Sequence, residues 1–264
     1  MTAAIFLAAA WRILFLTASA PVIGGVLLLA IARVTGARWE AAASRPVAMW
    51  LVVPGAALLG VAQLASPPPA HLAIWMNPLF VGIRAALAAG LLAFAGARIG
   101  AGRSVTFAAI TLALYAVLVT PVASDWLLGQ VPGHSVSAAG MMLCVEQISG
   151  ACALILALRR GEPRFRNNMA GLMIAALLAL GYFAFVDYLI IWFGNLPGRV
   201  PFYAARNGPI GAALVWLALA TGLAIPIAAL MVRRQRAAGF SALIALLLFN
   251  IWWVGWPMEG VAHG

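Results

Sequence analysis

Eight long apolar stretches, separated by short loops, repeat along the chain. A run of about 20 apolar residues is long enough to cross the hydrocarbon core of a bilayer as a helix. The stretches lie at residues 12–33, 46–65, 79–97, 105–124, 136–158, 169–194, 209–232 and 240–257. Because lipid cannot satisfy backbone hydrogen bonds, each stretch must form a helix. The sequence predicts an all-α, polytopic membrane helical bundle of about eight transmembrane helices, in a single transmembrane domain over residues 1–264.

The charge pattern predicts how this bundle is oriented. Hydrophobic residues make up 65% of the chain and charged residues 8%, a composition that a water-soluble fold cannot bury. Most arginines follow the first, third, fifth and seventh stretches, at positions 33, 38, 45, 98, 103, 159, 160, 164, 166, 233, 234 and 236. Loops rich in arginine stay in the cytoplasm, so both termini are expected on the outer side. The net charge of +10 therefore indicates topology, not nucleic-acid binding.

Cysteine and histidine usage argues against several cofactors. Cys144 and Cys152 are expected on one helix about 12 Å apart, too far for a disulfide. His71, His134 and His263 fall in loops or the tail, whereas a membrane haem needs axial histidines inside the bundle. No zinc or iron–sulfur spacing occurs. The sequence predicts no haem and no metal site in this chain.

Three ionisable residues fall inside the apolar stretches. Arg84, Asp187 and Glu146 are expected about 8, 12 and 16 Å below the outer boundary. Charged groups at such depths usually face a cavity or a partner, so with Asp125 they form a candidate proton path or polar cavity. The alternative is structural: Arg84 pairs with Asp187, Glu146 is protonated and hydrogen-bonded to a neighbouring helix, and Asp125 caps a helix at the membrane edge.

Residues 187–197, DYLIIWFGNLP, gather aromatic side chains, an acid and an amide around a helix end. Such a helix end offers stacking surface and hydrogen-bond donors to a quinone ring. It suits an aromatic belt at the membrane interface equally well. From physical chemistry alone, both interpretations stay open.

The order of several motifs resembles a known family. Besides DYLIIWFGNLP, followed by Phe202, Tyr203 and Arg206, the chain has TGARW at 35–39, Asn77 with Phe80 and Arg84, SDW at 124–126 and EQISGACALIL at 146–156. Together they resemble a membrane subunit of alternative complex III, a bacterial quinol to cytochrome c or oxidase electron-transfer assembly. That family is related to the membrane anchors of polysulfide and nitrite reductases. Asp187 departs from it, because a neutral or amide residue is more usual there.

The resemblance implies a haem-free subunit in the bacterial inner membrane that is not catalytic alone. Its expected partners are lipid, a multihaem cytochrome, an iron–sulfur protein and a second related membrane subunit, and these proteins would hold the haem and iron–sulfur clusters. A quinone or quinol is the expected ligand. The candidate quinone or partner contacts are Asn77, Trp126, Tyr188, Trp192, Asn195, Tyr203 and Arg206.

Two other classes of protein compete with this interpretation. A small transporter or channel would use the Arg84, Asp187 and Glu146 series as its polar path. Transporters often contain helices broken by proline, and Pro54, Pro121 and Pro226 are candidates for such breaks. A purely structural membrane anchor needs neither a path nor a ligand.

Overall fold

The computed structural model describes residues 3–37, 46–65, 73–102, 104–126, 138–194, 196 and 200–255. Several predictions fall outside these ranges. The three histidines, Asn195, the loop arginines Arg38, Arg45 and Arg103, and the C-terminal residues beyond 255 are not among the described residues, so their predicted roles stay predictions.

The described residues fold as α-helices with a few tighter or wider turns, which confirms the all-α membrane bundle. In chain order the elements are α1 (Ala3–Thr35), the 3₁₀ segment η1 (Pro46–Leu51), α3 (Val52–Gln63), α4 (Pro78–Gly100), α5 (Val105–Trp126), α6 (Ala139–Ala157), α7 (Pro163–Phe193), α8 (Val200–Ala204), α9 (Pro209–Leu219), the π-helical segment η4 (Ala220–Ala224), α10 (Ile225–Met231), α11 (Gln235–Asn250) and the π-helical segment η5 (Ile251–Gly255). Seven of the described helical stretches are long and apolar enough to cross a membrane, and the apolar helix over Ala48–Gln63 is shorter.

Most helix boundaries agree with the apolar pattern, but the first helix begins earlier. α1 starts at Ala3, nine residues before the predicted span. Arg12 therefore lies within α1, where it is completely buried, and its Nη2 donates to the Ala62 carbonyl near the end of α3, 3.0 Å away. A second difference is α8, a helix of 5 residues. It lies between the sixth and seventh apolar stretches, where the sequence predicts a loop.

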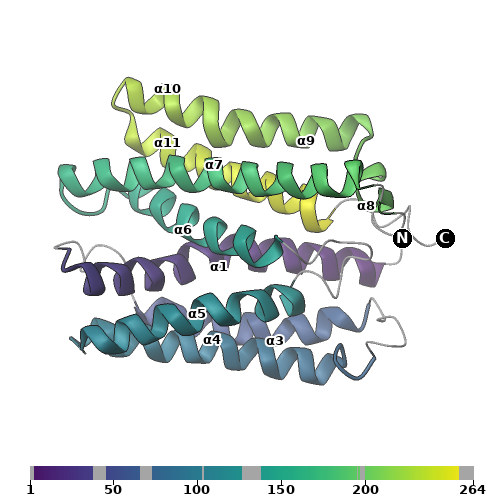
Figure 1. Cartoon of the computed structure of the whole chain (residues 1–264), viewed down its shortest axis with the longest axis horizontal. Helices are drawn as coiled ribbons and strands as arrows, with labels where there is room; N and C mark the ends of the chain where they lie inside the picture. The colour runs from purple at the N-terminus through teal and green to yellow at the C-terminus, as the bar shows by residue number, and fades with distance from the viewer. Residues whose placement is uncertain are drawn as a thin grey trace.

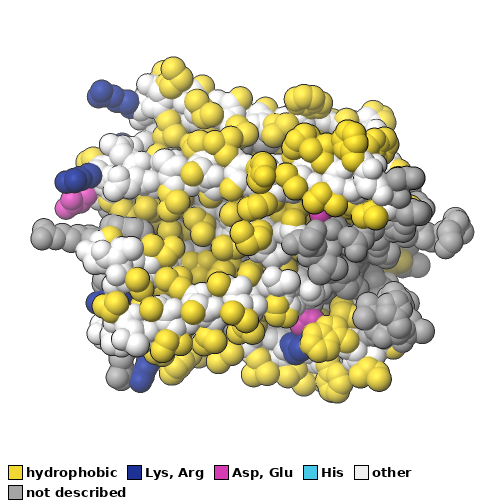
Figure 2. Space-filling view, in the orientation of Figure 1, with side chains coloured by type: hydrophobic (Ala, Val, Ile, Leu, Met, Phe, Trp, Pro, Cys, Tyr) yellow, Lys and Arg dark blue, Asp and Glu magenta, His cyan; other side chains and the backbone are white. Residues whose placement is uncertain are grey.

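α1 runs through the middle of the bundle. It packs against α3, α4 and α5 on one side and against α6 and α11 on the other, while α7, α9 and α10 lie beyond α6 and α11 (Figure 1). α1 and α6 are accordingly the most buried of the long helices, whereas α5 and the α9–α10 stretch leave most of their surface outward. Exposed apolar side chains from several helices lie over much of the described part of the face seen in Figure 2, as lipid contact requires.

The arginine-rich turns gather at one end of the bundle. The ends of α1, α4, α6 and α10 all point to the left in Figure 1, and the dark blue side chains concentrate at that end in Figure 2. Arg159 and Arg233 close α6 and α10 in a left-handed conformation, with φ of 53° and 58°. The next amide donates back to a carbonyl five residues earlier, from Arg160 to Ile155 and from Arg234 to Ala229.

Glycines allow the central helices to approach very closely. A Cβ on Gly24 of α1 would lie 1.8 Å from the Gln147 carbonyl oxygen of α6. A Cβ on Gly239 of α11 would lie 2.5 Å from the Ala153 carbonyl oxygen of α6. In lipid the hydrophobic effect does not drive helices together, so their association depends on van der Waals packing. Small residues at such crossings allow that packing because the two backbones can approach closely. α6 therefore packs closely against both α1 and α11, and polar side chains of these three helices come into contact.

Candidate ligand cavity and polar contacts

Arg84 pairs with Asp125, not with Asp187. Its Nε and Nη2 donate to the two carboxylate oxygens of Asp125, each at 2.8 Å, which is the bidentate geometry preferred by guanidinium and carboxylate. Nη2 also donates to the Trp75 carbonyl at 2.7 Å, and the guanidinium lies 4.2 Å from the centre of the Trp75 ring. Asp125 is buried, so it is not the solvated helix cap that the sequence left open.

Asp187 forms a second, separate contact. The Tyr203 hydroxyl of α8 donates to Asp187 Oδ2 of α7 at 2.7 Å, and the Asp187 side chain is buried. Burial, followed by the hydrogen bond to Asp187, raises the pKa of Tyr203 well above its usual value. Tyr203 is therefore a neutral donor at physiological pH.

Glu146 forms a third contact in the interior of the bundle. Asn250 Nδ2 of α11 donates to Glu146 Oε1 at 2.5 Å, and the same nitrogen lies 3.1 Å from Thr17 Oγ1 of α1. The structure thus distributes Arg84, Asp187 and Glu146 over three contacts between different helices. It does not bring them together in the single polar cavity that their similar depths suggested.

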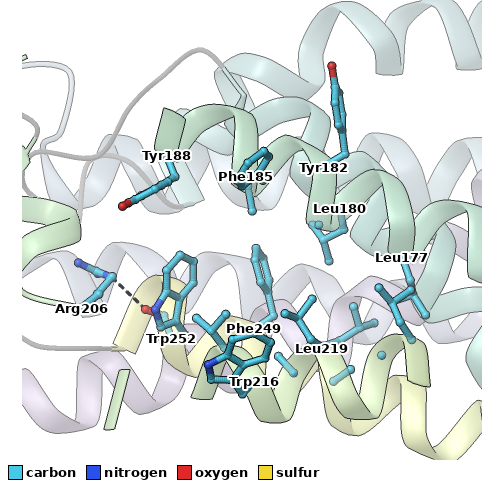
Figure 3. Close-up of a pocket in the computed structure, with 18 of the residues that line it drawn as sticks. Leu177, Leu180, Tyr182, Phe185, Tyr188, Arg206, Trp216, Leu219, Phe249 and Trp252 are labelled. Atoms are coloured by element: carbon cyan, nitrogen blue, oxygen red, sulfur yellow. Dashed lines mark hydrogen bonds between the residues drawn. The ribbon is translucent and has the colours of Figure 1, made fainter. Parts of the chain in front are cut away.

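A large cavity lies instead between α7, α8, α9 and α11. Its volume is about 630 Å³, within the range of small-molecule sites. Mostly apolar and aromatic side chains surround it (Figure 3), including Leu177, Leu180, Phe185, Trp216, Leu219, Phe249 and Trp252. From Leu177 to Tyr188, eleven residues along α7, the cavity extends about 16 Å.

The polar residues Tyr188 and Arg206 lie at one end of this cavity, opposite the end at Leu177 (Figure 3). Tyr203 and Asn207, next to Arg206 in the chain or close to it, also line the cavity. Tyr182 lines the cavity nearer its middle, but its hydroxyl points away from the other labelled side chains (Figure 3). The Tyr188 ring meets the Tyr203 ring edge to face at 5.2 Å, and Tyr203 lies 6.2 Å from Trp252. The cavity therefore has an aromatic end with hydrogen-bond donors and a long apolar remainder.

Arg206 fixes the geometry of the polar end. Its Nε and Nη2 donate to the carbonyls of Trp252 and Trp253, both at 3.0 Å, and Nη1 donates to the Phe202 carbonyl at 2.7 Å. The Trp252 and Trp253 carbonyls belong to the π-helical segment η5 and the Phe202 carbonyl to α8, so Arg206 joins these two elements. A guanidinium carries five N–H bonds, so two have no partner among the described residues and are available to a ligand. Burial lowers the pKa of Arg206 to about 10, which leaves it charged at neutral pH.

The remaining predicted contact residues have other positions. Trp192 stacks on Tyr188, with ring centres 5.8 Å apart, beside the polar end. Asn77 caps α4 by accepting a hydrogen bond from the Leu79 amide, and it does not line this cavity. Trp126 is buried against Phe15 and lines a smaller cavity of about 260 Å³ between α4, α5 and α6. Of the six predicted contacts that lie within the described residues, Tyr188, Tyr203, Arg206 and the adjacent Trp192 are gathered at one place, whereas Asn77 and Trp126 are not.

Sequence reasoning missed four residues that matter to these sites. Trp216, Phe249 and Trp252 line the cavity, and Asn250 binds Glu146. The sequence gives little indication that the three aromatic residues line a cavity, since tryptophan and phenylalanine are common in any apolar helix. Asn250 did carry a signal, because it is a lone amide within an otherwise apolar run.

The fold and its cavity define a multi-pass membrane protein with an amphipathic cavity among its helices. In the ranges that the structure describes, no three His, Cys, Asp or Glu side chains come together as metal ligands, and both cysteines are free thiols. No model of a known protein family matches the chain, and no curated protein sequence matches it.

Proposed function

We propose that the chain is a haem-free membrane subunit of a quinol-oxidising electron-transfer complex and that the cavity between α7, α8, α9 and α11 binds the quinone or quinol. The observation that carries this proposal is the polarity of the cavity, which is about 16 Å long, with donors and aromatic rings at one end and mostly apolar lining over the rest of its length. A quinone has the matching division into a ring with two carbonyls and an isoprenoid tail.

Each part of the cavity has a role in this proposal. The spare N–H bonds of Arg206 and the Tyr188 hydroxyl would donate to a ring carbonyl, and Trp252 and Phe249 would pack against the ring. The tail would lie along the leucine-rich remainder. Electron-carrying centres would belong to partner proteins: a multihaem cytochrome, an iron–sulfur protein and a second related membrane subunit. The arginine-rich end would face the cytoplasm of a bacterium, with both termini in the periplasm.

The competing functions have less support. A transporter needs polar groups along one route, and Arg84, Glu146 and Asp187 belong to three separate contacts. A purely structural anchor requires no cavity with oriented donors. The quinone-binding subunit is the function that uses both the shape of the cavity and the chemistry of its polar end.

A matched pair of glycine variants tests the binding site. Gly181 and Gly171 both lie on α7 with open space around the position of an added Cβ, but only Gly181 lines the cavity. Gly181→Phe should fill the cavity and weaken binding of decylubiquinone at least about tenfold, the effect of losing 1.4 kcal/mol. Gly171→Phe should bind like the unmodified chain. Binding is measured by quenching of tryptophan fluorescence, to which Trp216 and Trp252 contribute.

Two outcomes would contradict this proposal. Equal affinities of Gly181→Phe and Gly171→Phe would show that the quinone binds elsewhere. Displacement of decylubiquinone by an equimolar amount of phospholipid would show that the cavity is a general site for acyl chains.

A further inference from the structure

Glu146 is an acidic residue at a point where three helices meet. It projects from α6 toward Asn250 of α11, which also contacts Thr17 of α1. Glu146 and Asn250 are both fully buried, with no exposed surface. This contact is independent of the ligand cavity, since neither side chain lines it.

The unsatisfied atoms of this contact complement each other. Within the described part of the chain, Glu146 Oε2 and Asn250 Oδ1 are buried acceptors without a hydrogen-bond partner. Buried polar atoms are nearly always paired, so two orphans on the same pair of residues require an explanation. A proton on Glu146 Oε2 supplies it. The acid then donates to Asn250 Oδ1 while Asn250 Nδ2 donates to Glu146 Oε1, which closes a double hydrogen bond between acid and amide.

The surroundings contain no positive charge that would balance an ionised Glu146. No arginine among the described residues pairs with it. The titratable groups near it are Tyr115 of α5 and Cys144 of α6, and neither is cationic. An ionised carboxylate that is fully buried without a cation is strongly disfavoured inside a membrane bundle. A neutral carboxylic acid avoids that cost and satisfies both orphan atoms.

The amide orientation disfavours a metal cation. Asn250 Nδ2 is directed at both Glu146 Oε1 and Thr17 Oγ1. N–H donors repel a cation at the position where these oxygens would have to coordinate it.

We propose that Glu146, Asn250 and Thr17 form a proton-binding site in the interior of the bundle, in which Glu146 holds its proton at neutral pH through the acid–amide pair. Thr17 orients the amide of Asn250 by accepting from its second N–H. The ligand of this site is a single proton.

Infrared spectroscopy of the whole purified chain in lipid nanodiscs tests this proposal. At pH 7 the spectrum should contain a protonated carboxylic acid band that moves on labelling with ¹³C-glutamate. Glu146→Gln should remove the band, corresponding to one carboxyl per chain. Asn250→Leu should keep it at higher frequency, because the carboxyl loses its hydrogen-bond partner. Glu162→Gln is the control, since Glu162 is exposed in a loop, and it should leave the band unchanged.

Three results would overturn the proposal. One is a chain without a glutamate-dependent carboxylic acid band at pH 7, which the label reveals even if the variants fail to fold. Another is a band that persists in folded Glu146→Gln. The third is loss of the band on adding sodium or potassium ions at constant pH, which would make the site a cation site.

Discussion

Gly24→Val is expected to destabilise the bundle by at least about 3 kcal/mol, the upper part of the range for overpacked interiors. A Cβ at this position would overlap the Gln147 carbonyl oxygen, at 1.8 Å, and its carbonyl carbon, at 2.5 Å. Neither is the end of a flexible side chain, so α1 and α6 must move apart. The measurement is the free energy of unfolding in a detergent titration followed by circular dichroism.

Gly90→Val is the matched control for that experiment. Gly90 lies within α4, and an added Cβ there meets no atom within 4 Å. Gly90→Val therefore changes the helix propensity in the same way as Gly24→Val, but it introduces no clash with a neighbouring helix. Similar losses of stability in the two variants would show that α1 and α6 do not approach as closely as described.

Arg84→Leu is expected to cost about 3 kcal/mol, because removing one partner leaves the buried carboxylate of Asp125 without its guanidinium. The Asp125 side chain is only 7% exposed, so water cannot replace the lost partner. The double variant Arg84→Leu with Asp125→Leu should recover much of the loss. The same unfolding titration measures both.

Two comparisons make this prediction specific. Arg236→Leu, at an exposed arginine, should change stability by less than about 0.5 kcal/mol. Arg84→Leu combined with Asp187→Leu should show no recovery, since Asp187 bonds to Tyr203 instead. If stability recovered with Asp187→Leu but not with Asp125→Leu, Arg84 would pair with Asp187, as the structural alternative in the sequence analysis has it.

The helices themselves could be predicted because lipid leaves the chain no alternative. An apolar run of about 20 residues must satisfy its own backbone, so the boundaries of α4, α5 and α9–α10 agree with the sequence within a few residues. The predicted start of α1 at residue 12 is wrong because an arginine normally indicates the edge of an apolar span, whereas Arg12 lies inside the helix. Its burial depends on the Ala62 carbonyl of another helix, which no local pattern reveals.

The side-chain contacts were harder to predict than the helices. Depth along a helix gives height in the membrane but not the direction in which a side chain points, so Arg84 and Asp187 looked like partners. One available rule would have corrected this. α4 and α5 are sequential, antiparallel neighbours, and Arg84 lies near the start of α4 while Asp125 lies near the end of α5, so both are at the same end of the bundle. The Glu146 and Asn250 contact joins residues 104 positions apart, and only the packing of α6 on α11 brings them together.

Photoaffinity labelling with an azido-quinone tests the central claim most directly. The unmodified chain is labelled in lipid nanodiscs, and the modified peptides are identified by mass spectrometry. The quinone cavity predicts labels within residues 177–188, 212–223 and 245–252, all suppressed by excess decylubiquinone. Labels confined to the lipid-exposed faces of α4 and α5, or labels that decylubiquinone does not suppress, would contradict a quinone site in this cavity.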